Sequence, residues 1–477
     1  MRSIAGALGC LVCYTTLVAA QTATGLAGVK SVCIGSLGDK PGAAALREHL
    51  AAELEKTHRF RIVANHADAD AVLGGSGETW VKEHYSLNPR TRSVGDSQAL
   101  YAGYLSVELR AKNNEVLWSY LATPHAASGD VERELARLVA KKLAASDSPA
   151  PARAERRAAG PMITLNGAGA TFPYPVYLKW FDSFHARFPA ANVHYDAIGS
   201  EAGIARLMEG ASDFAASDVR ISSEEFFAGG KPKYLRFPTV LGAVVPIYNL
   251  AEVRGDLRFT PQILAGIYLG EIRKWNDPLI AEANRGTQLP DRDIAVVHRA
   301  DGSGSTYVWT DYLTKVSPAW KSAIGASGLP HWPVGTGAPG NEGVAQLVRD
   351  TPGSIGYVEY IYAITNHLSY GSVRNAAGRF VSPDLESITA AAQGSPSRIA
   401  EDLQTSITNP GGAGAYPIAS FSWFVVPATI DDADKKKALR DLLRWVLGPG
   451  QNEAAALGYV AIPQQLLERE LRLVESF

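Results

Sequence analysis

The chain has 477 residues, a length sufficient for two to four domains. Of these residues 46% are hydrophobic and 20% charged, a composition typical of a soluble globular protein. Its formal net charge of −2 argues against nucleic acid or an anionic membrane surface as a partner. A bound anion would therefore have to be held by a local site instead of by the overall field.

The amino terminus has the pattern of an export signal. Arg2 supplies a positive charge, residues 4–20 are apolar, and small residues at 18–20 precede the polar Gln21. The apolar stretch is shorter than the ~20 residues that a membrane-spanning helix needs. We therefore expect residues 1–20 to be a signal peptide and the mature protein to be periplasmic or extracellular.

Residues of about 28–145 are predicted to form a small α+β accessory domain. The expected elements, in chain order, are strands at 29–35, 59–63 and 69–81, a hairpin at 101–122 that turns at Asn113-Asn114, and helices at 43–57 and 130–146, the second capped by Asp130. The pattern, together with the phrase ADADAVLG at 67–74, resembles accessory domains of cell-envelope proteins, such as the amino-terminal domain of the Tol system's β-propeller protein. That resemblance implies an envelope partner, of unknown identity, for residues 28–145.

Residues 146–161, SDSPAPARAERRAAGP, mix proline, alanine and charge without hydrophobic periodicity. Such a composition is typical of a flexible linker between units that fold independently. From Met162 onward, apolar strands alternate with helical patterns, which is the α/β signature. We therefore expect a separate α/β domain over residues 162–477.

Three strand-to-helix junctions in this second unit combine glycines with hydroxyl residues. They are GAGATF at 167–172, IGS at 198–200 and RADGSGST at 299–306. Each has a simple interpretation as a helix cap, and none is a P-loop. The free N–H groups at a helix start also attract anions. Three such junctions in one α/β unit favour a shared oxyanion site.

Eight motifs identify a family. GAGATFP, AIGS, AASD, FPTVLGAVV, IYLGEIRKWNDP, RADGSGST, IGYVEY and YPIASFSW occur in this order. Over residues of about 162–465 the chain resembles the phosphate-binding proteins of Pst-type ABC transporters. The resemblance implies a type II periplasmic-binding-protein fold with hinge crossovers, with lobe I at ~162–240 and ~417–477 and lobe II at ~241–416. It also implies inorganic phosphate and membrane permease subunits as partners, and no cofactor or metal.

The resemblance also implies the phosphate-binding residues. Matched by motif, they are Thr171, Phe172, Ser200, Asp218, Arg299, Ser303, Gly304 and Ser305, with Asp301 holding the Arg299 guanidinium. Asp218 would accept a hydrogen bond from a phosphate proton and repel sulfate, which carries none. Arg299 offers a planar fork of donors to an oxyanion. Glu201 departs from the family pattern and adds negative charge near the site.

Two other functions stay open. A phosphatase needs a nucleophile with a base, or metal ligands, whereas the histidines here are dispersed and His298, in the strand IAVVHR, is more simply packed. We therefore do not expect an enzyme. A phosphate-sensing envelope scaffold, acting through residues 28–145, is the second alternative.

Overall fold

The computed structural model describes residues 26–86, 97–124, 127–146, 162–219, 227–228, 231–394 and 406–477. The predicted signal peptide, and the predicted linker apart from Ser146, lie outside the described residues. Within the described ranges, no helix combines the length and the apolar character needed to cross a membrane.

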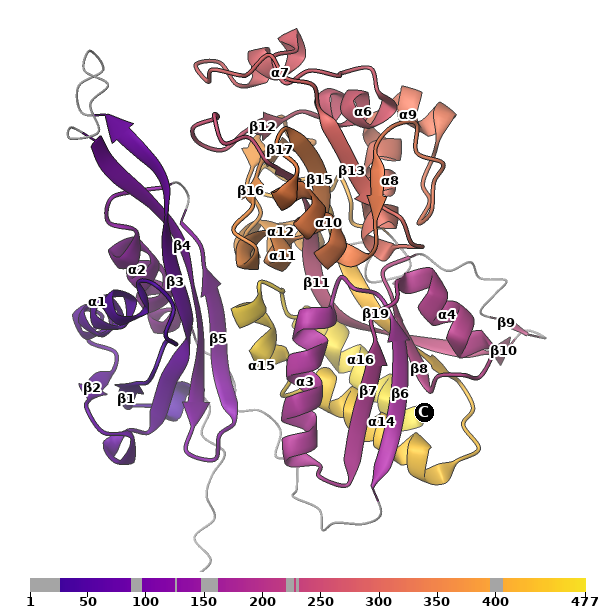
Figure 1. Ribbon diagram of the computed structural model, residues 1–477. Helices are drawn as coiled ribbons and strands as arrows, with labels where there is room; N and C mark the ends of the chain where they lie inside the picture. The colour runs from indigo at the N-terminus through magenta and orange to yellow at the C-terminus, as the bar shows by residue number, and fades with distance from the viewer. Residues whose placement is uncertain are drawn as a thin grey trace, which may run out of the picture.

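The amino-terminal unit is a five-stranded sheet with two helices on one face (Figure 1). The strand order is β2-β1-β3-β4-β5, in which β1 is parallel to β2 and β3 and the remaining pairs are antiparallel. The elements are η1 Leu26–Gly28, β1 Ser31–Ile34, α1 Ala43–Lys56, β2 Arg61–Val63, η2 His66–Asp68, β3 Ala71–Ser86, β4 Ser97–Ala111, β5 Val116–Ala122 and α2 Val131–Ala144. Leucines four residues apart on α1, Leu46, Leu50 and Leu54, are fully buried against the sheet.

Local turn and cap chemistry explains part of this unit. Asn114 takes a left-handed conformation, with φ of 65°, in the β4–β5 turn, which Asn tolerates better than most residues. Asp130 occupies the predicted N-cap position of α2, but the prediction that its side chain caps the helix is wrong. Asp130 precedes α2 but its side chain makes no capping hydrogen bond and instead pairs with Arg133 at 3.2 Å. An ion pair one turn along the helix has taken the place of the cap.

The second unit is built on one nine-stranded sheet that runs through two lobes (Figure 1). The strand order is β14-β13-β15-β11-β19-β8-β6-β7, with β16 also paired to β11. The strands are β6 Ile163–Gly169, β7 Ala191–Asp196, β8 Phe214–Ser217, β11 Tyr234–Tyr248, β13 Ala295–Arg299, β14 Thr336–Ala338, β15 Ser354–Glu359, β16 Ser369–Tyr370 and β19 Ala419–Pro427. Small two- and three-residue strands lie apart from it: β9 Phe227–Ala228, β10 Lys231–Pro232, β12 Arg258–Phe259, β17 Ser372–Arg374 and β18 Phe380–Val381.

Helices cover both faces of this sheet (Figure 1). In lobe I they are α3 Tyr174–Arg187, α4 Ser200–Met208, α14 Ala433–Val446, α15 Gln451–Ala454, η4 Ala455–Leu457 and α16 Gln464–Ser476. In lobe II they are α6 Pro261–Leu269, α7 Pro278–Ala283, α8 Gly304–Val316, α9 Pro318–Ala323, α10 Gly340–Asp350, α11 Tyr360–Thr365 and α12 Leu385–Gln393.

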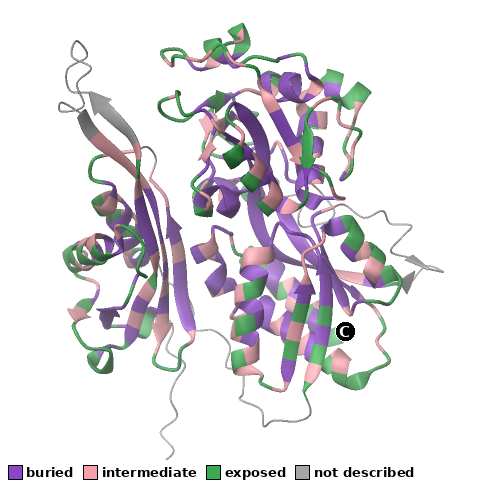
Figure 2. Ribbon diagram, viewed as in Figure 1, coloured by how far each residue is buried: buried purple, intermediate pink, exposed green. Residues whose placement is uncertain are grey.

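Strand β11 passes from one lobe into the other. Its first part, Tyr234 to Ala243, pairs with β19, and its second part, Val244 to Tyr248, pairs with β15 of lobe II. Both β11 and β19 are buried along most of their length (Figure 2). Because continuous paired strands join the lobes, the lobes can rotate about this connection without breaking the sheet within either of them.

The amino-terminal unit packs against the second unit. Tyr104 and Leu121, from β4 and β5, are buried in the large hydrophobic core that otherwise belongs to residues after 162. The remaining apolar side chains of the first unit form a core of their own. Most of the buried apolar side chains of each unit pack within that unit. That the two units fold independently stays a prediction.

Candidate functional site

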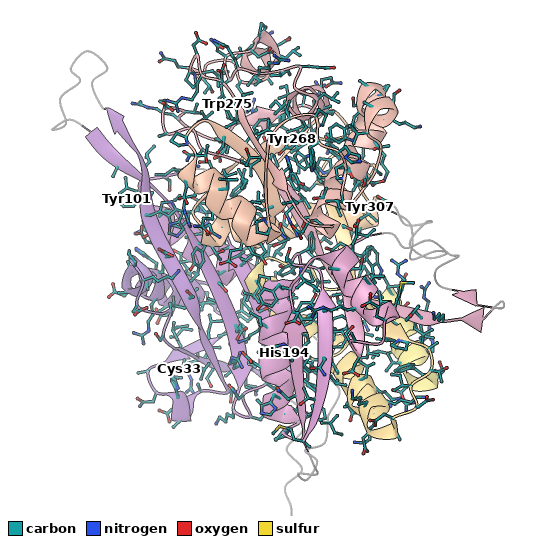
Figure 3. The ribbon with its side chains drawn as sticks, turned by 45° about the vertical axis from the view of Figure 1, so that its right-hand side comes forward. Cys33, Tyr101, His194, Tyr268, Trp275 and Tyr307 are labelled. Carbon is teal, nitrogen blue, oxygen red and sulfur yellow. The ribbon has the colours of Figure 1, made fainter. Side chains whose placement is uncertain are left out.

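The site is built where strands end and helices begin. Thr171 follows β6, Ser200 follows β7, Asp218 follows β8 and Arg299 ends β13, all at carboxyl ends of parallel strands. Ligands bind at this edge in open α/β sheets. Figure 3 labels Tyr307, which lies in α8 near the level where the two lobes meet.

Four helices begin around these residues. Helix α3 starts just after Thr171 and Phe172, α4 starts at Ser200, α8 starts at Gly304, and α10 starts at Gly340. The first N–H groups of a helix lack intrahelical partners and carry partial positive charge. Together, the four helix starts concentrate partial positive charge at one place in a protein of slightly negative net charge, which is an arrangement that suits an anion.

Arg299 is held rigidly inside the site. Its side chain is only 1% exposed, and its Nε donates to Asp301 Oδ1 at 2.8 Å while its Nη2 donates to Asp301 Oδ2. Its Nη1 donates to Thr171 Oγ1 of lobe I at 3.2 Å. Burial of Asp301 opposes its ionisation, but the Arg299 guanidinium and the Gly340 N–H outweigh it and hold the pKa of Asp301 below its ordinary value. The arginine is therefore aimed by a charged partner behind it.

Asp218 is buried without a hydrogen-bonding partner for its carboxylate. The residue is 2% exposed, and neither Oδ1 nor Oδ2 makes a hydrogen bond within the part of the chain that the structure describes. Burial raises the pKa of Asp218 to about 7, opposed by the nearby Ser422 hydroxyl and by the Arg299 charge. Among the described residues, the Ser422 hydroxyl makes no hydrogen bond of normal geometry, so the carboxylate stays unpartnered. Such a group is costly in a protein interior unless something donates to it.

The two lobes meet directly over Asp218 and Ser200. A Cβ at Gly304 would lie 2.2 Å from Asp218 Oδ2 and 2.6 Å from Ser200 Oγ, so only glycine allows this approach. The backbone N–H of Glu201 donates to the Gly302 carbonyl across the lobes at 3.3 Å. The lobes are thus in a closed arrangement.

The remaining predicted residues lie in the same place. The carbonyls of Thr171 and Phe172 accept from the hydroxyls of Tyr362 at 2.8 Å and Tyr459 at 2.6 Å. Ser303 Oγ caps α8 by accepting from Thr306 N at 3.1 Å, so its hydrogen is free to donate to a ligand. Ser305 is 1% exposed in the first turn of α8. The loop RADGSGST is thus a helix cap as well as part of the site.

Two charged or titratable residues lie at the edge of this region. Glu201 is the departure from the family pattern, and the residue as a whole is exposed. Its carboxyl group is nevertheless partly desolvated, and this desolvation, with the Asp301 charge, raises the pKa of Glu201 above the ordinary value. His298 stacks on Trp332, with ring centroids 4.7 Å apart, and its partial burial lowers its pKa. A packed histidine fits the sequence interpretation of this position better than a catalytic base.

Sequence reasoning missed Asn341 and Glu359. Asn341 is fully buried, and its Nδ2 donates to Thr171 Oγ1 at 3.0 Å and to Ser305 Oγ at 3.1 Å. Glu359 is also fully buried, and burial raises its pKa well above the ordinary value. A signal for Asn341 is present in the sequence, because TGAPGN is a fourth glycine-containing junction at which a helix starts.

The fold and the geometry define a two-lobed α/β protein with a candidate oxyanion site where the lobes meet. Residues 145–449 match the family model of the PBP superfamily domain. The Phosphate-binding protein PstS of Xylella fastidiosa (strain Temecula1) is 42% identical over 308 residues, covering 64% of this chain and 84% of that protein. The Phosphate-binding protein PstS of Pasteurella multocida is 40% identical over 307 residues, covering 64% and 88%.

A solved structure agrees at the level of the fold. The phosphate-binding protein from Stenotrophomonas maltophilia superposes with a TM-score of 0.51 at 22% identity, covering 65% of this chain and 93% of that one. The chain therefore belongs to the PBP superfamily and, within it, to the family of PstS phosphate-binding proteins. About a third of the chain, at its amino-terminal end, lies outside the matched region.

Proposed function

We propose that this protein binds inorganic phosphate and delivers it to the permease subunits of an ABC importer. Relatives at about 40% identity are named as phosphate-binding proteins, and the residues that the motifs predict lie around one closed site. In this proposal Arg299 supplies a charged fork and the helix starts supply N–H groups. Thr171, Ser200, Ser303 and Ser305 supply hydroxyls.

The observation that carries the proposal is the buried, unpartnered carboxylate of Asp218 beside an arginine. An anion that carries a proton satisfies both groups, because its oxygens accept from Arg299 and its O–H donates to Asp218. Phosphate at neutral pH carries at least one proton. A sulfate ion carries none, so its lone pairs would face those of Asp218.

Delivery to an importer requires the protein to lie outside the cytoplasm, which agrees with the predicted signal peptide at residues 1–20. We propose export with cleavage after Ala20, and membrane permease subunits as partners. The predicted envelope partner of residues 28–145 stays a proposal of the same kind. Binding, and not catalysis, is the proposed activity, in keeping with the phosphate-binding proteins to which the chain is similar.

Calorimetry on purified mature protein tests the function. We expect phosphate and arsenate to bind at one site per chain, because both anions are tetrahedral and protonated, and sulfate to bind far more weakly. Amino-terminal sequencing of the exported sample should begin near Gln21. Absence of phosphate binding, or equal affinity for sulfate, would refute the proposed function.

A further inference from the structure

Asn341 is the first feature of the site without an assigned role. Its Oδ1 accepts from the backbone N–H of Glu359 at 3.1 Å, and that N–H can only donate. The orientation of the amide is therefore fixed, with Nδ2 facing the hydroxyls of Thr171 and Ser305. Thr171 belongs to lobe I and Ser305 to lobe II, so one buried amide contacts both lobes.

The amide controls which way these hydroxyls point. A hydroxyl oxygen accepts two hydrogen bonds and donates one. Thr171 Oγ1 accepts from Asn341 Nδ2 and from Arg299 Nη1, so both of its acceptor positions are used. Its hydrogen must then be donated elsewhere. Ser305 Oγ likewise accepts from Asn341, which leaves its hydrogen to donate.

We propose that Asn341 is a positioning residue that keeps the hydroxyls of Thr171 and Ser305 as donors toward the bound anion. This inference rests on the proposed phosphate-binding function. An anion offers only lone pairs to these hydroxyls apart from its own protons, so a hydroxyl that turned its oxygen toward the anion would be repelled. In lobe I, Asn341 and Arg299 together fill both acceptor positions of the Thr171 hydroxyl and prevent that orientation. In lobe II, Asn341 fills one of the two acceptor positions of the Ser305 hydroxyl and so favours the donor orientation.

The test is Asn341→Asp in the full chain, which keeps the shape but replaces the donor by an acceptor. At pH 8 we expect phosphate affinity to fall at least about tenfold. On lowering the pH to 5 the introduced carboxyl gains a proton and can donate again, so the loss should shrink. Asp218, Glu359 and phosphate itself are present in both experiments, and the charges of Arg299 and Asp301 are common to both proteins. The ratio of the phosphate affinity of the variant to that of wild type, compared at the two pH values, therefore reports on the introduced carboxyl group.

Asn249→Asp is the matched control. Asn249 also donates through Nδ2, to the carbonyls of Val348 and Arg349, but lies outside the site, so its variant should bind as wild type at both pH values. Equal affinities of Asn341→Asp and wild type, or a loss that does not change with pH, would overturn the inference. Failure of the wild type to bind phosphate would overturn the proposed function instead.

A second inference concerns the amino-terminal unit, which contacts both lobes at once. Figure 1 shows its sheet standing beside both of them. Toward lobe I, Ser106 Oγ donates to the Ala456 carbonyl at 2.7 Å and Ser119 Oγ donates to the Asn452 carbonyl. Leu121 packs near Gly458, where a Cβ would lie 3.3 Å from its Cδ2.

The contacts with lobe II come from the same sheet and from Thr123, which directly follows its last strand. Trp80 stacks on His367 with ring centroids 4.0 Å apart, and Lys82 pairs with Asp256 at 2.7 Å. The hydroxyl of Thr123 shares a hydrogen bond of 3.0 Å with that of Tyr360. A rotation of the lobes about β11 and β19 cannot preserve both sets of contacts, because one sheet and the residue that follows it make them all.

The segment of lobe I that the amino-terminal unit contacts is directly followed in the chain by residues that contact the site. Residues 452–458 are followed by Tyr459, whose hydroxyl donates to the Phe172 carbonyl and lies 3.1 Å from Glu359 Oε2. The neighbouring Val460 pairs with Leu241 of the crossing strand β11. The amino-terminal unit thus packs on the segment that joins the hinge to the anion site.

We propose that the amino-terminal unit is a brace that favours the closed arrangement of the lobes and so raises the affinity for the anion. Contacts made only in the closed state shift the open–closed equilibrium by their own free energy. Apparent affinity rises in proportion to the fraction of molecules that are competent to bind. The brace acts on that fraction and touches no ligand.

The test is the double variant Trp80→Ala/Lys82→Ala in the full chain, with Thr123→Val as a milder variant. We expect phosphate affinity to fall about threefold to tenfold in the double variant and by less in Thr123→Val. Without phosphate, the radius of gyration of the double variant in solution scattering should be larger than that of wild type. Lys56→Ala and Arg133→Ala, whose side chains are 65% and 57% exposed on the far helices, are controls without effect. Unchanged or higher affinity in the double variant would overturn the brace, whereas Asn341 and the binding function would stand.

Discussion

Replacing Arg299 with alanine is expected to reduce phosphate affinity by at least about tenfold, and by about a hundredfold if two charge-assisted hydrogen bonds are lost. The guanidinium is buried, and the carboxylate of Asp301 lies directly behind it. Without the arginine that carboxylate would face the anion uncompensated. The loss therefore includes a new repulsion as well as the missing bonds.

Calorimetry of three variants separates these contributions. Arg299→Lys keeps the positive charge but loses the fork, so its affinity should lie between those of wild type and Arg299→Ala. Asp301→Asn keeps the arginine but releases one of the partners that aim it. Arg292→Ala is the matched control, because Arg292 pairs with Glu252 on the surface of lobe II. Wild-type affinity in a folded Arg299→Ala protein would show that RADGSGST only caps a helix.

The second large effect is expected for Asp218→Asn, in which selectivity should change more than phosphate affinity does. The amide keeps an acceptor for the phosphate O–H and removes the charge that repels sulfate. An unpaired buried charge costs more than ~1–3 kcal/mol, so discrimination against sulfate should fall by at least about tenfold. The affinities for both anions, measured at pH 8, give this ratio.

The pH dependence of sulfate binding provides an independent check. In the closed arrangement the pKa of Asp218 is about 7, so the carboxyl gains a proton as the pH falls from 8 to 6 and becomes a donor. Wild-type protein should then bind sulfate more tightly at pH 6 than at pH 8. The Asp218→Asn variant should lose this dependence. A flat profile in wild type would contradict the assigned role.

The same carboxyl should affect stability in the absence of ligand. Its pKa is raised in the folded state, so folded protein holds a proton between about pH 4 and 7 that unfolded protein has released. Stability is therefore lost as the pH rises through this window, by up to ~4 kcal/mol. Thermal unfolding without phosphate should show Asp218→Asn more stable than wild type at pH 8 and equal to it near pH 4.

Two controls isolate Asp218 in this experiment. Burial also raises the pKa of Glu453 to about 7 and raises that of Glu359, but both residues are present in variant and wild type alike. Asp350→Asn, at a 59% exposed side chain, should leave the profile unchanged. Added phosphate should stabilise wild type at pH 8, because it is expected to supply the donor that Asp218 lacks.

Much of the site was predictable from local sequence. Junctions such as GAGATF and RADGSGST reveal helix starts through glycine and hydroxyl residues, and the ordered motifs identified the family that the comparisons confirm. The elements of the first unit were predictable for a similar reason. Hydrophobic spacing and turn residues such as Asn114 act over a few positions, so a short window contains the signal.

The sequence by itself thus determined the family, and it predicted the two units and the residues of the candidate site, because the signals for all three lie in contiguous segments. Only the tertiary structure decided which side chains are buried and which residues from distant parts of the chain contact one another. The unpartnered state of Asp218 depends on packing by distant segments, and the bonds of Asn341 join residues 36 and 170 positions away. The docking of β5 on residues 452–458 spans more than 300 positions. Burial and pairing are properties of the assembled fold, since each arises from segments that meet only when the chain has folded.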